Sequence, residues 1–264
     1  MSLDRSYPHA GNHSIQNAVL AVEWAPEIDA NELAVVCESA HEILLAYPKV
    51  DPLQTLRLNV APAGPSIASI PQVTGYAYSR LSSSGVLQKQ IQIGRASCLI
   101  LVSDYKRWKD LIGEVKAIFA KVTGNLPSGV TITTAGLQYS DRFVWKGAAD
   151  ELDLAEVFRS NSPYLTPHAL RCKQPWHSHH GYFEASEDPV SFNGLNNINV
   201  DVVDGQDGRA IQILTAHRAS LQTPVLAIDA MDSVLALLDA LHGLNESVFK
   251  QLLSEQLLGK INLS

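Results

Sequence analysis

The stretch that decides the fold class runs from residue 87 to residue 122 and reads LQKQIQIGRASCLILVSDYKRWKDLIGEVKAIFAKV. Leu87 to Ile93 alternates apolar and polar residues, which is typical of a strand with one buried face. Gly94 and Arg95 form a turn, and Cys98 to Val102 is an apolar run of buried-strand length. From about Tyr105 to Val122 the apolar residues recur at helical spacing. Neighbouring strands followed by a helix that can cover them indicate an α+β fold.

The chain before this stretch supplies further strands and a capped helix. Tyr76 to Leu81 predicts one strand, and Val19 to Trp24 predicts another because its apolar residues alternate. Asp29 and Glu32 have the spacing of a capping box at the start of a helix. Residues 61–75, rich in proline and glycine, predict a loop or a strand edge.

The chain after this stretch repeats the plan more loosely. The predicted strands are Val130 to Leu137, Trp176 to Ala185, Asn199 to Val203, Ala210 to Ala216 and Val225 to Ile228. Leu152 to Phe158 predicts a short helix, and residues 160–175 predict a loop. A long helix is expected from Asp232 or Ser233 to about Leu258, with a break at Gly243. We therefore expect two similar antiparallel sheet–helix units, residues 1–148 and 149–264, whose likeness suggests a structural duplication. They would pack as one compact body or as two closely associated domains.

Charge and composition exclude several classes of protein. The formal net charge of −7 disfavours binding to nucleic acid, which needs a concentrated positive surface. No apolar run approaches the roughly 18 residues of a membrane span, and the N-terminus does not read as a signal peptide. Cys37, Cys98 and Cys172 are widely spaced and odd in number, which favours a reducing cytoplasm. Cys172, beside two basic residues, is the cysteine to test for reactivity, and an unreactive surface thiol is the simpler interpretation.

Several short motifs, each present once, are spread along nearly the whole chain. The run Cys98 to Trp108 leads into the amphipathic helix, and Gly136-Leu137-Gln138-Tyr139 follows it. Leu241-His242 precedes Phe249 near the C-terminus, and Asn17-Ala18-Val19 opens the first strand. In these motifs the chain resembles a sporadically distributed family of prokaryotic proteins of about this length, whose function is uncharacterised. The resemblance implies one architecture over the whole chain, and it implies no activity, cofactor or catalytic residue.

The chain departs from that family at one motif. The family usually has Gly-Leu-Arg-Tyr followed by Asn, whereas this chain has Gln138 and then Ser140. A role tied to the family's arginine is therefore not carried over.

Three histidines within four positions, His177, His179 and His180, form the densest group of potential metal ligands. On a strand, His177 and His179 would share one face and His180 would lie on the other. A third ligand such as Glu184, His168 or His217 would complete a divalent-metal site able to activate water for hydrolysis. An exposed histidine-rich strand edge that binds no metal is the simpler interpretation.

A second group follows the predicted strand that ends at Leu137. Tyr139, Asp141, Arg142 and Trp145 combine polar and aromatic side chains that could bind a ligand or a partner. A surface ion pair between Arg142 and a neighbouring aspartate is the simpler interpretation.

These patterns favour a non-catalytic, cytoplasmic, prokaryotic protein that binds a protein or a small molecule, without a required cofactor. A sheet with helices on one face leaves the other available, so self-association as a homodimer is expected. The competing hypothesis is a metal-dependent hydrolase that uses His177, His179 and His180.

Overall fold

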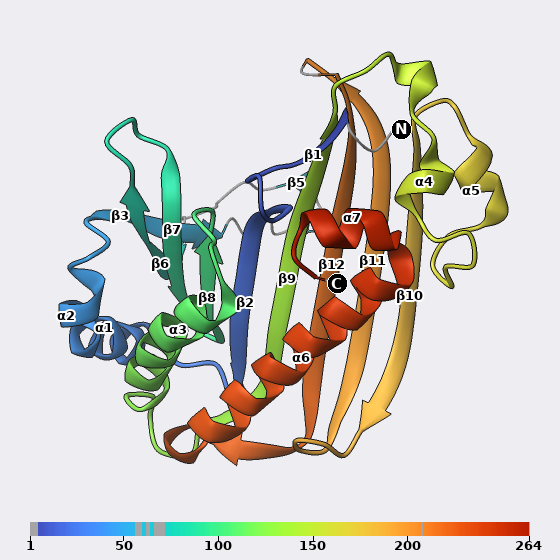
Figure 1. The fold of residues 1–264 in the computed structure, drawn as a ribbon. Helices are drawn as coiled ribbons and strands as arrows, with labels where there is room; N and C mark the ends of the chain where they lie inside the picture. Colours follow the sequence, from blue (N-terminus) through green and yellow to red (C-terminus); the bar gives the residue numbers. More distant parts are fainter. Residues whose placement is uncertain (1–4, 56–59, 62–63, 66–71, 207, 264) are drawn as a thin grey trace.

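The computed structural model describes residues 5–55, 60–61, 64–65, 72–206 and 208–263. Its main element is a ten-stranded antiparallel sheet in the order β10-β11-β12-β9-β2-β8-β7-β6-β3, with β1 also paired to β9. Helices lie diagonally across one face of this sheet (Figure 1). The chain is therefore an α+β protein, as the sequence predicts.

Residues 5–145 form one flank of the sheet and its central strands. The elements of this part are β1 (Ser6–Pro8), β2 (Ile15–Ala25), α1 (Ala30–Ser39), α2 (His41–Leu44), β3 (Lys49–Thr55), β4 (Val60–Ala61), β5 (Gly64–Pro65), β6 (Gln72–Leu81), β7 (Leu87–Gly94), β8 (Ser97–Val102), α3 (Trp108–Thr123) and β9 (Thr131–Trp145). The predicted capping box is present: the Asp29 side chain accepts from the Glu32 backbone N–H, and the Glu32 side chain accepts from the Asp29 backbone N–H.

The rest of the chain forms the other flank. Its elements are η2 (Ala149–Glu151), α4 (Leu154–Val157), α5 (Pro167–Arg171), β10 (Trp176–Ser186), β11 (Phe192–Gly205), β12 (Gly208–Leu226), η3 (Ala227–Asp229), α6 (Met231–Leu252) and α7 (Glu255–Lys260). The strands predicted at Asn199 to Val203 and Ala210 to Ala216 are confirmed, and they belong to a hairpin in which β11 pairs with β12 up to Gly205 and Gly208. In the described part of the chain, none of these helices is both long and apolar enough to cross a membrane.

The two flanks share part of their order of elements, although β3, β4 and β5 of the first flank have no counterpart in the described part of the second. The first runs from β2 through α1 and α2 to the meander β6-β7-β8 and then α3, and the second runs from β9 through α4 and α5 to the meander β10-β11-β12 and then α6. The β9–β2 ladder joins the two flanks into one continuous sheet. The duplication itself stays a prediction.

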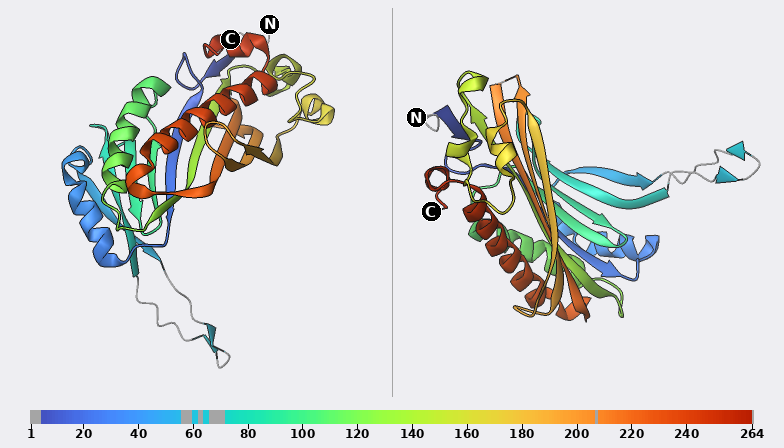
Figure 2. Two further views of the ribbon diagram at one scale, coloured as in Figure 1. Left: turned by 90° about the horizontal axis from the view of Figure 1, so that it is seen from below. Right: turned by 90° about the vertical axis from the view of Figure 1, so that its right-hand side faces the viewer.

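The helices lie against one face of the sheet (Figure 2), and the hydrophobic core lies between them and the strands. It consists of two buried clusters, one under α1, α3 and the first half of α6, and one under the second half of α6 and α7. β9 and α6 run through both clusters. Leu137 and Tyr139 of β9 belong to the first cluster, and Phe143 and Trp145 belong to the second.

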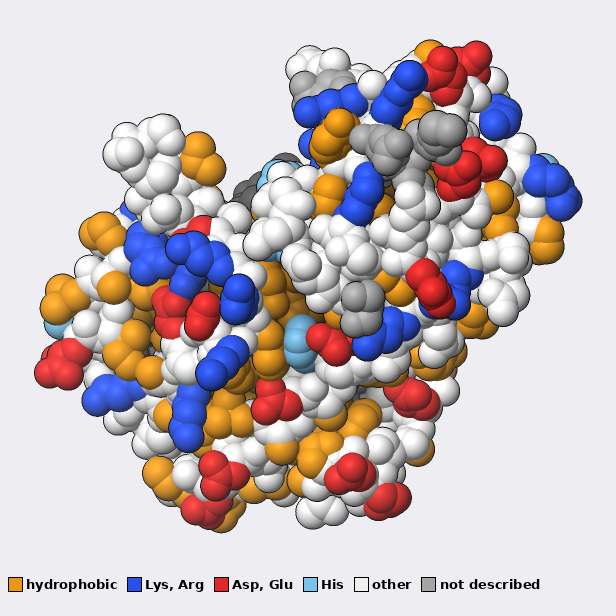
Figure 3. Space-filling view, in the orientation of Figure 1, with side chains coloured by type: hydrophobic (Ala, Val, Ile, Leu, Met, Phe, Trp, Pro, Cys, Tyr) orange, Lys and Arg blue, Asp and Glu red, His pale blue; other side chains and the backbone are white. Residues whose placement is uncertain are grey.

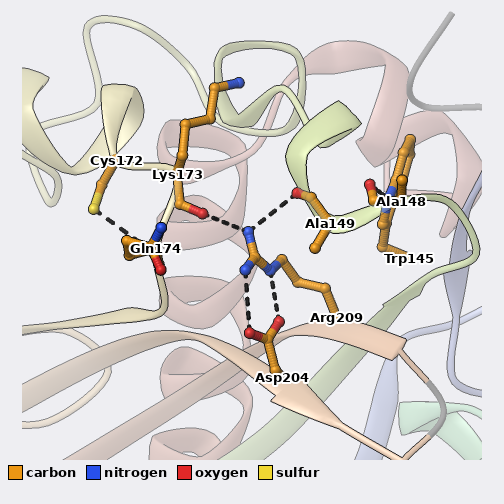
Figure 4. Close-up of polar contacts among 8 residues, drawn as sticks. All are labelled: Trp145, Ala148, Ala149, Cys172, Lys173, Gln174, Asp204 and Arg209. Carbon is orange, nitrogen blue, oxygen red and sulfur yellow. Dashed lines mark hydrogen bonds and ion pairs between the residues drawn. The ribbon is translucent and has the colours of Figure 1, made fainter.

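One buried arginine ties the β11–β12 hairpin to the chain beside it. The Arg209 guanidinium forms two hydrogen bonds with the Asp204 carboxylate, of 2.8 and 3.2 Å, and donates to the carbonyls of Ala149 and Lys173 (Figure 4). This contact fixes the segments that precede α4 and follow α5. A lysine could not reproduce the fork geometry, because it presents a single point charge.

Three predictions of local structure are wrong. Residues 160–175 contain the helix α5, which Thr166 caps by accepting from the Ala169 N–H. Val225 and Leu226 extend β12 rather than forming a separate strand, since β12 resumes its pairing with β9 after an irregularity. The last long helix breaks at Leu253, not at Gly243, because Ser254 caps the new helix α7. Most of the predicted loop 61–75 lies outside the described residues.

Candidate functional site

A cavity of about 570 Å³ lies on the helical face of the sheet, where the two buried clusters meet. Its walls come from the β1–β2 loop, the loop after β8, the middle of β9, α6 and the residues after α7. Figure 3 shows this face of the molecule, with a histidine and an acidic side chain side by side near its centre. The volume is in the range of small-molecule binding pockets.

Asp141 is the residue that makes this cavity unusual. Asp141 is 97% buried. It is an ionisable residue on the buried face of β9, whose neighbouring positions on that face carry core residues. Oδ1 accepts a hydrogen bond of 2.7 Å from the Ser14 hydroxyl, whereas Oδ2 has no partner among the described residues. Burial raises the pKa of Asp141 to about 7, and the bond from Ser14 opposes this only in part. At neutral pH the carboxyl can therefore hold or release a proton.

Aromatic rings surround this carboxyl. Tyr105 contacts both His13 and Tyr139 edge to face, with ring centroids 5.6 and 5.9 Å apart. The Tyr139 hydroxyl lies 3.0 Å from Nδ1 of His242, whose ring stacks on Trp108 at 4.4 Å. Burial raises the pKa of Tyr105 to about 12 and also raises the pKa of Tyr139, so both hydroxyls stay protonated.

The ring stack also fixes the two helices above the cavity. Trp108, at the start of α3, donates from Nε1 to the Asp239 carboxylate of α6 at 2.7 Å. Burial lowers the pKa of His242, although Glu246 and Asp239 oppose the shift. His242 is therefore largely neutral at pH 7, so one ring nitrogen carries a hydrogen and can donate while the other can accept.

A buried polar network begins at the cavity wall and leads toward the edge of the sheet. Asn245 of α6 lines the cavity and accepts from the Thr215 hydroxyl at 2.6 Å. His217 lies between Asn245 and Asn196, with Nδ1 2.8 Å from the Asn196 oxygen. Asn196 in turn donates to Glu184 of β10 at 2.7 Å. Burial lowers the pKa of His217 to about 4, so this ring is neutral in the folded protein.

Charged side chains lie at the mouth of the cavity. Lys106 and Arg107 precede α3 and are exposed, and Glu246 of α6 lies 3.6 Å from Nε2 of His242. The charges of exposed side chains are screened by solvent and salt. Asp141, at the buried wall, is therefore the ionisable group with most influence on a bound molecule.

The structure separates the four residues predicted to form a ligand surface. Tyr139 and Asp141 both line the cavity. Arg142 alternates to the opposite face of the sheet, and Trp145 packs in the second buried cluster while its Nε1 donates to the Ala148 carbonyl at 2.8 Å.

The histidine group lies on β10, at one edge of the sheet. His177 and His179 point to the exposed face, while His180 points to the helical face and contacts Tyr164 edge to face. Glu184 also lies on the helical face, and His217 is buried in the network described above. Within the described ranges, no three His, Cys, Asp or Glu side chains gather in a way that could hold a metal ion.

The cysteines do not contribute to the cavity. Cys98 is fully buried in the core, and burial raises the pKa of its thiol. Cys172 is partly exposed, with its sulfur 3.6 Å from the carbonyl of Gln174.

Sequence reasoning missed His13, Ser14, Tyr105 and His242, which come from three distant segments. The available signal was a polar residue at a core position. Asp141 interrupts the apolar alternation of β9, and Asn245 interrupts the apolar stripe of α6. Local rules of this kind are broken most often at functional sites.

No protein-family model and no curated protein matches this chain. Among solved structures, the crystal structure of the di-domain ARO/CYC StfQ from the steffimycin biosynthetic pathway is similar over 88% of this chain and 96% of that chain, with 10% sequence identity and a TM-score of 0.16. A TM-score this low supports no inference about fold or function.

Proposed function

We propose that this protein binds a small organic molecule in the cavity beneath α6, with a hydrogen-bond donor of the ligand on Asp141. The observation that carries the proposal is the buried Oδ2 of Asp141, which has no partner among the described residues. An unpaired buried polar atom costs about 1–3 kcal/mol, and more when it is charged. Neighbouring atoms cover Oδ2 in the free protein, so a ligand that supplies the missing donor must first displace one of them, and it then removes this cost.

The surroundings of Asp141 support binding over a purely structural role. A structural aspartate at this depth would have hydrogen-bond partners on both oxygens. The cavity beside Asp141 is large enough for a small molecule, and its walls combine aromatic rings with a few polar groups. A binding role without catalysis agrees with the expectation from the sequence. A cytoplasmic location is also proposed, on the three free cysteines.

A fragment screen by ligand-observed NMR tests this proposal. Fragments that bind the wild type should bind the Asp141→Asn variant at least tenfold more weakly. The matched control is Asp229→Asn, which changes an exposed aspartate outside the cavity. Binding that is equal in all three proteins, or a wild type that binds no fragment, would show that the proposed function is wrong.

A further inference from the structure

The carboxyl of Asp141 and the rings around it also indicate which chemical class of ligand the cavity accepts. We infer that the ligand is an organic amine, bound as its ammonium ion against Oδ2 of Asp141 within the aromatic walls of the cavity. This inference rests on the proposed function and specifies its ligand.

The unpaired oxygen by itself calls for a donor, which an alcohol or an amine could supply equally well. The aromatic walls distinguish the two, because a ring face attracts a cation and has little preference for a neutral hydroxyl. Tyr105, Tyr139, His13 and His242 all line the cavity and contact one another in a chain. A cation removed from water is attracted more strongly by the face of an aromatic ring than the same cation in solvent.

The charges that face the cavity also favour a cation at its inner end. Asp141 and Glu246 are the acidic residues of the lining, and Lys106 and Arg107 are the basic ones, exposed at the mouth. Burial lowers the pKa of both His13 and His242, so neither ring carries a full charge at neutral pH. An ammonium group beside Asp141 therefore meets a carboxyl and neutral rings, whereas a carboxylate there would meet an acid.

Binding of an ammonium ion should displace the proton from the Asp141 carboxyl. Burial raises the pKa of Asp141 to about 7, so part of the free protein carries the protonated carboxyl at neutral pH. The ammonium stabilises the ionised form and lowers this pKa, since an opposite charge nearby favours ionisation. Affinity should therefore rise up to tenfold per pH unit below about 7 and level off above it.

A panel of nine compounds tests the inference by isothermal titration calorimetry. It combines three skeletons, n-butyl, cyclohexylmethyl and 2-phenylethyl, with three head groups: a primary amine, an alcohol and a carboxylate. Each compound is titrated into the wild type, Asp141→Asn and Glu246→Gln at pH 6, 7 and 8, in two buffers of different ionisation enthalpy.

We expect at least one amine to bind the wild type tenfold or more tightly than its matched alcohol at pH 8. This preference should vanish in Asp141→Asn and persist in Glu246→Gln. At pH 6 the amine should bind more weakly and release about one proton, which the two buffers reveal.

Four outcomes would overturn the inference. If an alcohol or a carboxylate binds as tightly as its matched amine, or if Glu246→Gln alone abolishes the preference, the ligand is not an amine on Asp141. If none of the nine compounds binds while other fragments occupy the cavity and depend on Asp141, the amine class is wrong and the proposed function stands. If no fragment binds the cavity at all, both are wrong.

Discussion

The Asp141→Asn substitution should change the pH dependence of stability in a defined direction. The pKa of this carboxyl rises from 3.8 to about 7 on folding. Between these values the unfolded chain has released the proton and the folded chain still holds it, so the free energy of unfolding falls as the pH rises toward 7. Asparagine does not titrate, so the free energy of unfolding of the variant does not fall for this reason.

The magnitude follows from the same values. One pKa unit corresponds to 1.36 kcal/mol, so the carboxyl lowers the stability of the wild type by about 3 kcal/mol between pH 5 and pH 8. The asparagine N–H groups find no acceptor at the position of Oδ2, which costs about 1–3 kcal/mol at every pH. The variant should therefore be slightly less stable than the wild type at pH 5 and as stable or more stable at pH 8.

Urea denaturation followed by tryptophan fluorescence at pH 5, 6, 7 and 8 measures this difference. The difference between variant and wild type should move by about 3 kcal/mol in favour of the variant over this range. The control Asp229→Asn should give a constant difference. A constant difference for Asp141→Asn would refute the reasoning, because it would show that Asp141 titrates alike in the folded and unfolded chains.

Three further predictions concern the rest of the molecule. The pKa of His217 falls to about 4 on folding, so this group should lower the free energy of unfolding of the wild type by about 3 kcal/mol as the pH drops from 6.5 to 4. Urea denaturation of His217→Gln should not show this decrease. Arg209→Lys should lower the free energy of unfolding by about 1–3 kcal/mol, because lysine cannot keep all the hydrogen bonds of the guanidinium. Arg218→Lys, on an exposed ion pair, should cost less than about 1 kcal/mol in the same assay. The free energy of unfolding of the double variant His177→Ala/His179→Ala should lie within about 0.5 kcal/mol of that of the metal-free wild type, because both rings are exposed. Mass-spectrometric metal analysis of both proteins tests the metal hypothesis. Near-stoichiometric metal in the wild type that is lost in the variant would support that hypothesis.

The fold was predictable wherever periodicity is strong. The alternation before Ile93, the apolar run of β8 and the stripe of α3 all appear close to their predicted positions. Short elements were not predictable, since α5 depends on a single cap at Thr166 rather than on a repeating pattern. The break between α6 and α7 was misplaced because a glycine is tolerated inside a well-packed helix.

The site was predictable only in part. Tyr139 and Asp141 were chosen as a polar and aromatic pair, and they meet in the cavity because residues two apart on a strand share a face. Arg142, one residue further, lies on the opposite face for the same reason. His13 and His242 could not be predicted as neighbours, because the fold alone brings the β1–β2 loop against α6.

The most direct test of the account is the titration of the Asp141 carboxyl carbon by ¹³C NMR, assigned by comparison with Asp141→Asn. The account predicts a pKa of about 7 in the free protein and a lower pKa once an amine from the panel is bound. Titration at the ordinary value of 3.8 in the free protein would contradict it, because the buried carboxyl would then already have the partner that the cavity ligand is proposed to supply.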